Sequence, residues 1–180
     1  MNNTTLLIII LIVVAIVAVL LVAFFIFRRQ QQRRQERARQ EYGPEYERTV
    51  EERGSEREAE RELRERRERM ESEVQPLSEE SRRHYDERWR RVEQTFVDNP
   101  GASLEEADRV VTEILAERNF PTDSQQETSK GVGVMYPGVV EDFREAQRVR
   151  QDAASAQEGT DLENMRQAIQ KYRSVYERLR

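Results

Sequence analysis

The run LLIIILIVVAIVAVLLVAFFIF, at residues 6–27, contains only Leu, Ile, Val, Ala and Phe. As an α-helix it would rise about 33 Å, which is enough to cross a hydrocarbon core about 30 Å thick. A helix also satisfies its own backbone groups where no water is present to do so. The sequence therefore predicts an N-terminal transmembrane helix over 6–27, preceded by a short extracytoplasmic N-terminus at 1–5.

The flanks of this run predict its orientation. Residues 1–5 carry no basic side chain, whereas arginines crowd 28–39, and basic residues beside a span stay on the cytoplasmic side. We expect a single-pass signal anchor in the cell membrane, with the N-terminus outside and the C-terminal domain cytoplasmic. A cleavable signal peptide fits less well, because the apolar run is long, no basic residue precedes it and no small-x-small cleavage pattern follows it.

The first arginines after the run are expected at the membrane interface. Each basic residue near anionic lipid head groups contributes roughly 1 kcal/mol to membrane binding. Lipid binding is one interpretation, and an ordinary stop-transfer and topology signal is the simpler one. Both place the same side chains at the head groups: Arg28, Arg29, Arg33 and Arg34.

Composition argues against several classes of activity. The chain has 180 residues, of which 36% are charged, and its formal charge is −5. The absence of Cys excludes disulfides, thiol nucleophiles and thiolate metal sites. The single His, His84, has no acidic residue three positions before it, and no hydrolase, zinc-protease or nucleotide motif appears. We expect no enzyme activity, no catalytic, metal or cofactor site, and no nucleic-acid binding, because Glu residues interleave with the Arg residues.

The charged segment 28–75 is predicted to form juxtamembrane helices with a break at 42–46. Pro disfavours helical geometry in the residue before it, and Gly weakens the turn. Glu–Arg pairs at i,i+4 support a helix over 45–74, but its apolar positions are too sparse for a sustained coiled coil. We expect a solvated spacer, with pairing to a second copy or to the C-terminal domain as the alternative. The break is a hinge or a recognition motif, formed by Tyr42, Gly43, Pro44 and Tyr46.

Apolar residues recur at helical spacing over 76–180, and no strand-like alternation of adequate length appears there. This pattern predicts an all-α fold, an antiparallel helical bundle of about four helices joined by short turns. The residues expected in its core, or at an interaction surface, are Trp89, Phe96, Phe143, Tyr172 and Tyr176.

Capping residues predict where these helices begin and end. Ser and Thr hydroxyls, alone or with a Glu three residues later, satisfy unpaired amides at a helix start. Pro suits the first turn, and Asn tolerates the left-handed conformation at a helix end. The predicted starts are Ser78, Ser103 with Glu106, Pro137, and Thr160 with Glu163, and the predicted end is Asn119.

The polar segment 122–134 is predicted to be a flexible loop. It ends in Lys130-Gly131-Val132-Gly133, which lacks the G-x-x-x-x-G-K-[ST] spacing of a phosphate-binding loop between a strand and a helix. We therefore expect no phosphate site there.

Several motifs resemble a known family. They are Y-G-P-E-Y at 42–46, P-L-S at 76–78, R-W-x-x-V-x-x-x-F-V-D at 88–98, E-A-D-R-V-V at 106–111 and the closing helix at 162–172. Together they resemble a family of uncharacterised bacterial, actinobacterial-type single-pass membrane proteins. The segment 122–137 departs from the family pattern, in which a short helix occupies that place. The resemblance implies an anchored helical domain and supplies no catalytic residue.

Two functions remain open from the sequence. The first is a membrane-anchored interaction or scaffold protein that recruits or spaces an unidentified protein partner, with a homo-oligomer also allowed. The alternative is a membrane-tethered sensor that binds a small apolar ligand or a lipid within the bundle. A sizeable apolar pocket near Trp89 and Tyr172 would favour the sensor.

Overall fold

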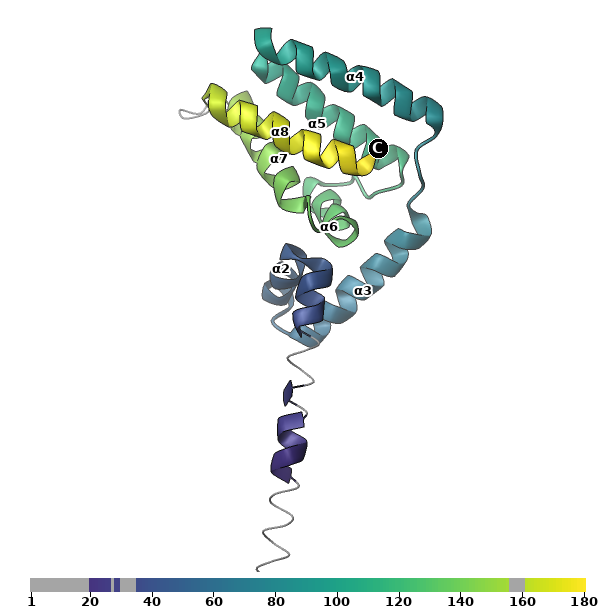
Figure 1. Cartoon of the computed structure of the whole chain (residues 1–180), viewed down its shortest axis with the longest axis vertical. Coiled ribbons are helices and arrows are strands. Elements are labelled where there is room, and N and C mark those ends of the chain that lie inside the picture. The colour runs from purple at the N-terminus through teal and green to yellow at the C-terminus, as the bar shows by residue number, and fades with distance from the viewer. Residues whose placement is uncertain (1–19, 27, 30–34, 156–160) are drawn as a thin grey trace, which may run out of the picture. The chain divides into compact units, whose positions relative to one another are not determined.

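The computed structural model describes residues 20–26, 28–29, 35–155 and 161–180 (Figure 1). Every regular element within these ranges is an α-helix, which confirms the predicted all-α class. The chain divides into two compact units, Met1–Gln40 and Glu41–Arg180.

The predicted transmembrane helix falls mainly outside the described residues, because 1–19 and 27 are not among them. Residues 20–26 and 28–29 are helical. Among the described residues, no helix combines the length and the apolar character that crossing a membrane requires.

Two helices open the second unit, α2 (Pro44–Arg53) and α3 (Glu56–Glu73), and we call them the α2–α3 hairpin. Gly43 precedes α2 with a φ of 53°, and Gly54 ends α2 in the left-handed conformation with a φ of 66°. Both positions favour glycine, because a Cβ is strained at positive φ. The predicted break at 42–46 therefore appears as a turn at Gly43, with a second turn at Gly54.

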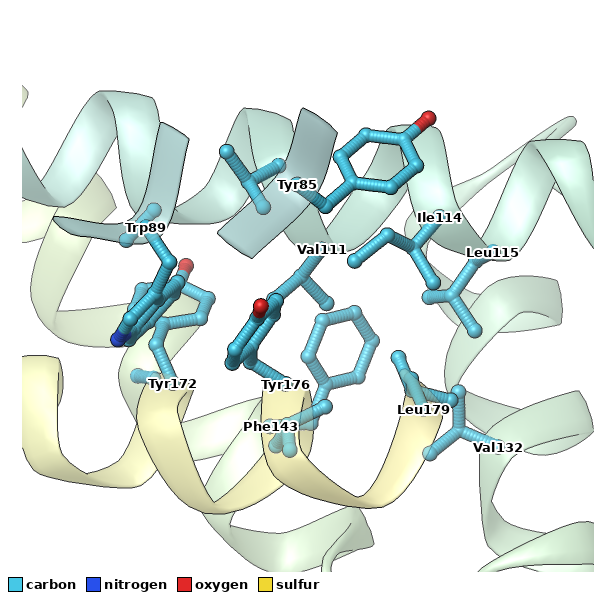
Figure 2. Packing of buried hydrophobic residues seen from close by; sticks show 14 of the residues in the cluster. Tyr85, Trp89, Val111, Ile114, Leu115, Val132, Phe143, Tyr172, Tyr176 and Leu179 are labelled. Atoms are coloured by element: carbon cyan, nitrogen blue, oxygen red, sulfur yellow. The ribbon is translucent and has the colours of Figure 1, made fainter. Parts of the chain in front are cut away.

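Four longer helices form the bundle, α4 (Glu79–Asp98), α5 (Pro100–Glu117), α7 (Val140–Ala154) and α8 (Leu162–Leu179). Consecutive pairs run antiparallel in Figure 1, and α8 packs on both α5 and α7. The helical bundle is confirmed. Its core draws apolar residues from each helix, as Figure 2 shows for Trp89, Val111, Phe143 and Tyr176.

The predicted loop at 122–134 is wrong. Residues Gln125–Met135 form α6, and the Ser124 hydroxyl caps it by accepting a hydrogen bond from the Glu127 amide at 3.2 Å. Two glycines make this a poor helix in isolation. Burial compensates, because Thr128, Ser129 and the whole run 131–134 are buried against the neighbouring helices.

Helix starts differ from prediction in three places. Ser78 caps α4 as expected, but Asn99 caps α5, and the Ser103 hydroxyl instead donates to the Val92 carbonyl at 2.8 Å. The capping box at Ser103 and Glu106 is therefore wrong, because Pro100 starts the helix one turn earlier.

The last two helices also begin later than predicted. Pro137 lies in the turn before α7, which starts at Val140. Asp161 caps α8 by accepting from the Asn164 amide at 2.8 Å, and Thr160 lies outside the described residues.

The second unit, Glu41–Arg180, contains the segment 41–75 as well as the bundle predicted over 76–180. The hairpin packs on α6. Of the interpretations given for this segment, pairing with the C-terminal domain therefore fits the structure, and a solvated spacer does not. Tyr46, Ala59 and Leu63 are each at most 1% exposed, so sparse apolar positions suffice where α6 covers them.

Candidate functional site

The described N-terminal residues present an exposed apolar surface. Six side chains between Leu20 and Ile26 are more than half exposed. Arg28 and Arg29 are also exposed, and the Arg28 guanidinium lies 6.0 Å from the ring centroid of Phe24. The other two predicted interface arginines, Arg33 and Arg34, lie outside the described residues.

The Y-G-P-E-Y motif is largely buried. Tyr42 and Tyr46 are 6% and 1% exposed, and Glu45 between them is 1% exposed. Gly43 lies close to the turn that precedes α7. A Cβ added at Gly43 would lie 3.2 Å from the Pro137 Cβ. In this structure the motif is packed inside the second unit, and its two tyrosines and its glutamate are shielded from solvent.

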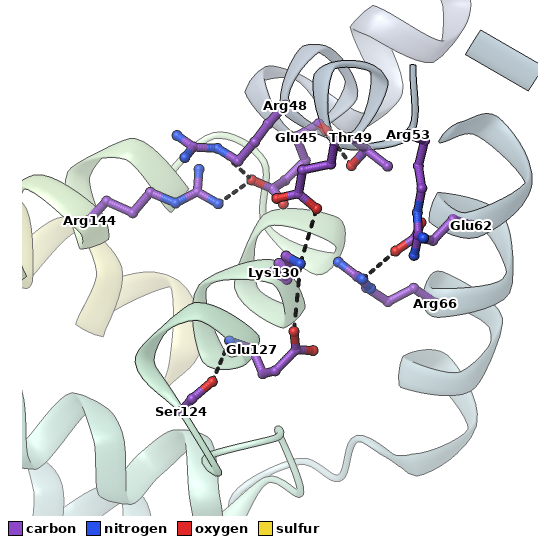
Figure 3. Close-up of polar contacts among 11 residues, drawn as sticks. Glu45, Arg48, Thr49, Arg53, Glu62, Arg66, Ser124, Glu127, Lys130 and Arg144 are labelled. Carbon is purple, nitrogen blue, oxygen red and sulfur yellow. Dashed lines mark hydrogen bonds and ion pairs between the residues drawn. The ribbon is translucent and has the colours of Figure 1, made fainter. Parts of the chain in front are cut away.

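Glu45 occupies a site that we call the Glu45 notch, formed by Glu45, Gly133 and Arg144. A Cβ added at Gly133 would clash with the Glu45 Cγ, so the glutamate side chain fills the space that a larger residue would need. The Arg144 guanidinium donates to the Glu45 carboxylate (Figure 3). Arg48 lies 3.7 Å from the same carboxylate. The charge of Glu45 is thus paired inside the fold, as burial requires.

Further ion pairs join α2, α3 and α6 around the notch (Figure 3). The Lys130 ammonium lies 3.1 Å from Glu52 on α2 and 3.6 Å from Glu127 on its own helix. Glu62 accepts hydrogen bonds from both Arg53 and Arg66. The hydrogen bond from Arg53 holds the pKa of the Glu62 carboxyl below its usual range, against the opposing effect of burial.

Most of the aromatic residues predicted for the core are buried there. Trp89 and Tyr176 stack with ring centroids 4.6 Å apart and an interplanar angle of 6°. Tyr172 and Phe143 are fully buried, whereas Phe96 is half-buried and lies outside the core cluster. Phe96 lies in the last turn of α4, which ends at Asp98.

A polar chain crosses the core beside Tyr172. The Tyr172 hydroxyl donates to Asp108 at 2.9 Å, and the Asp108 carboxylate also receives Gln147 at 3.3 Å and lies 3.2 Å from Arg150. Burial, followed by the charge of Asp108, raises the pKa of Tyr172. A tyrosine held neutral among these partners has a structural part in joining α5, α7 and α8.

Two of the cavities on the second unit bear on a ligand function. The larger, about 430 Å³, lies between α3 and the loop after α5, and its lining includes Arg66, Arg69, Met70 and Phe120. The smaller, about 230 Å³, lies beside Trp89 and Tyr176. Six of the eight residues that line the smaller cavity are charged, so it is not the apolar pocket that a sensor of apolar ligands would need.

The described residues contain no group of His, Cys, Asp and Glu side chains arranged to hold a metal ion. His84 packs edge-on against Tyr85, with ring centroids 5.4 Å apart. Its surroundings are those of a surface histidine on α4.

The Glu45 notch was missed at the level of sequence. Its two signals were present, a glutamate inside an aromatic turn and a glycine-rich run after Lys130. Glu45 and Arg144 are 99 positions apart in the sequence. Neither of the two local signals therefore indicates that these residues meet.

No protein-family model, curated protein or solved structure matches the chain. The resemblance to a family of single-pass membrane proteins therefore stays a prediction.

Proposed function

We propose that this chain is a membrane-anchored helical interaction protein. Residues 6–27 span the cell membrane, the N-terminus lies outside, and the unit Glu41–Arg180 lies in the cytoplasm, where it holds a protein partner near the inner leaflet. Arg28 and Arg29 contact anionic head groups.

The observation that carries the proposal is the exposed apolar helix at 20–26. Soluble surfaces rarely leave this much contiguous apolar area uncovered, and such patches are typical of membrane or protein contacts. Here the patch continues an apolar sequence run and is followed at once by exposed arginines. This order of apolar helix and basic flank is what a cytoplasmic membrane boundary requires.

The second unit supports an interaction function over a sensor function. Its core is filled by packed aromatic and aliphatic side chains, and the cavity beside Trp89 is small and lined chiefly by charged residues. The outer surface carries mixed charge, which suits recognition of another protein without a strong field for nucleic acids.

Membrane anchoring is tested by fractionation of cells that express the full chain. Alkaline extraction should leave the protein with the membranes. Replacing two central residues, Ile16→Arg and Val17→Arg, should shift it to the soluble fraction, because each Arg at a span centre costs about 2.5–3.5 kcal/mol. The matched control is Val97→Arg, which changes a residue that is 83% exposed on α4 and should leave fractionation unchanged. Extraction of the unmodified chain into the soluble fraction would refute the anchor.

Orientation and partner need separate measurements. A C-terminal fluorescent-protein fusion should be active and a C-terminal alkaline phosphatase fusion inactive, whereas the reverse would place the second unit outside. Crosslinking of the anchored protein in intact cells, followed by mass spectrometry, should recover the same cytoplasmic protein partner reproducibly. Recovery of lipid alone would favour the sensor.

A further inference from the structure

The α2–α3 hairpin has a small apolar core of its own. Tyr46, Ala59 and Leu63 are buried but lie outside the apolar cluster that fills the bundle. Within the described residues, Met70, which is 5% exposed, is the buried hairpin residue that joins the bundle cluster. The hairpin is therefore a separate packing layer laid against α6.

Polar groups make much of the contact between the hairpin and the bundle. Glu45 pairs with Arg144 across Gly133, and Glu52 pairs with Lys130 at 3.1 Å. Each is a specific pair between a residue on α2 and a residue on α6 or α7. Glu45 is the buried member of its pair, at 1% exposed, whereas Arg144 also pairs with Glu141 at 2.8 Å on its own helix.

One short connector joins the hairpin to the bundle. Residues 74–78 lie outside any helix and include Pro76, which keeps the preceding residue extended. Two hydrogen bonds hold the connector in place, from the Gln75 amide to the Arg118 carbonyl at 3.1 Å and from Arg118 Nε to the Gln75 carbonyl at 3.0 Å. Five extended residues span up to about 17 Å, so a modest opening at Gln75 would carry the whole hairpin away from its own bundle.

We propose that the hairpin exchanges between two copies of this chain. In the exchanged dimer, Glu45 of each copy occupies the notch made by Gly133 and Arg144 of the other copy, and Glu52 pairs with Lys130 of the other copy. Exchange of an identical element reproduces every contact of the single chain, so it costs little beyond the association itself. A short connector that holds a proline is the kind of hinge at which such exchange occurs.

The geometry favours a second copy as the occupant. The notch is shaped by a glycine around one glutamate side chain, and its charge is satisfied by that carboxylate. A generic acidic segment would need the same turn at Gly43 against Pro137 to bring a carboxylate to Gly133. A second copy carries that turn by definition. The inference concerns Glu41–Arg180 and does not depend on the membrane span.

A charge exchange between two variants tests this assembly. Glu45→Lys and Arg144→Glu each place like charges together in the notch of a single chain. When the two variants, carrying different affinity tags, are unfolded in denaturant and refolded together, both intermolecular notches regain opposite charges. We expect a mixed dimer that co-purifies through both tags, and little association for either variant alone. Two folded species that stay separate in the mixture would overturn the proposal.

A second pair of variants avoids the buried charge and keeps the test decisive if the first pair misfolds. The chain has no Cys, so single substitutions Glu52→Cys and Lys130→Cys introduce one reactive thiol each. The two positions pair across the contact between the hairpin and α6. Co-refolded chains treated with a short bismaleimide should give a crosslinked mixed dimer.

The matched control replaces Lys130→Cys with Arg91→Cys, an exposed residue on the outer side of α4, and the crosslinked dimer should disappear. A chain carrying both Glu52→Cys and Lys130→Cys reports the unexchanged form through an internal crosslink. Internal crosslinking in that chain, together with no crosslink between the two single variants, would show that the hairpin docks only on its own bundle.

Discussion

At the scale of single residues, Gly133 decides whether α2 can dock. Its missing Cβ leaves the space in which the Glu45 side chain reaches Arg144. We expect Gly133→Ala to destabilise the protein by about 1–3 kcal/mol, because the added methyl overpacks the notch and displaces a buried carboxylate. Chemical denaturation followed by circular dichroism measures this change.

The control for this prediction is Gly138→Ala. A Cβ there meets nothing within 4 Å, so the free energy of unfolding should stay within about 0.5 kcal/mol of the parent. Equal losses for the two variants would mean that general glycine effects, and not the fit of Glu45, limit stability.

Two tyrosines should make stability sensitive to high pH. Burial, followed by a hydrogen bond to a carboxylate, raises the pKa of both Tyr85 and Tyr176 to about 12. In the unfolded chain tyrosine ionises near pH 10, so between about pH 10 and 12 the unfolded state releases protons that the folded state retains. The contribution is complete below pH 10 and is lost as pH rises through this window.

The measurement is the free energy of unfolding across that window. The double variant with Tyr85→Phe and Tyr176→Phe should lose less stability than the parent between pH 10 and 12, whatever its stability at neutral pH. An identical slope for parent and variant would contradict the assignment.

The residue scale is also where sequence analysis was most mixed. Periodicity identified Trp89, Phe143, Tyr172 and Tyr176 correctly, because a repeated apolar spacing has one interpretation on a helix. It failed for Phe96, which was predicted for the same core but is half-buried and lies outside the core cluster. The spacing of apolar residues predicts which side of a helix is apolar. It does not predict how far along that side the neighbouring helices extend.

At the scale of elements, α6 shows what sequence could not predict. Two glycines, polar residues and a Gly-rich end indicated a loop, yet the segment is a helix enclosed by α3, α7 and the bundle core. Tertiary burial overrides weak intrinsic propensity here. One local signal was available, since Ser124 followed by Glu127 is a capping box sequence.

The cap gives an element-scale prediction. Ser124→Ala should cost about 1 kcal/mol of stability, because the Glu127 amide loses its acceptor at the start of α6. Hydrogen exchange should show the loss first at the amides of 126–128. The control Ser72→Ala removes an exposed hydroxyl near the end of α3 and should be close to neutral; a larger loss for Ser72→Ala would argue against a stabilising cap at Ser124.

At the scale of the whole molecule, the second unit carries two apolar clusters that should fail separately. Leu63 lies fully buried in the hairpin, and Trp89 lies in the bundle. Leu63→Ala should cost about 2–5 kcal/mol and expose hairpin amides to exchange, while Trp89 fluorescence stays native. Trp89→Ala should cost about 3–5 kcal/mol and weaken the bundle itself.

Residue-resolved hydrogen exchange with mass spectrometry distinguishes these outcomes. A uniform loss of protection over hairpin and bundle in both variants would mean one cooperative core. At this scale the sequence predicted the bundle well, because the apolar side of each of its four helices can be recognised from local spacing. It predicted the hairpin poorly, because the contact between hairpin and bundle depends on pairs such as Glu52 with Lys130, which only the folded chain brings together.

The enclosure of α6 has a consequence for the order of folding. This helix is too short and too rich in glycine to persist alone, and its partners lie both before it, in α3, and after it, in α7. During synthesis it must wait for the segments that follow it, so we expect it to be unstructured in the transition state, with φ-values near zero over Gln125–Met135. Because the hairpin packs on α6, we expect it to dock only after this helix has formed.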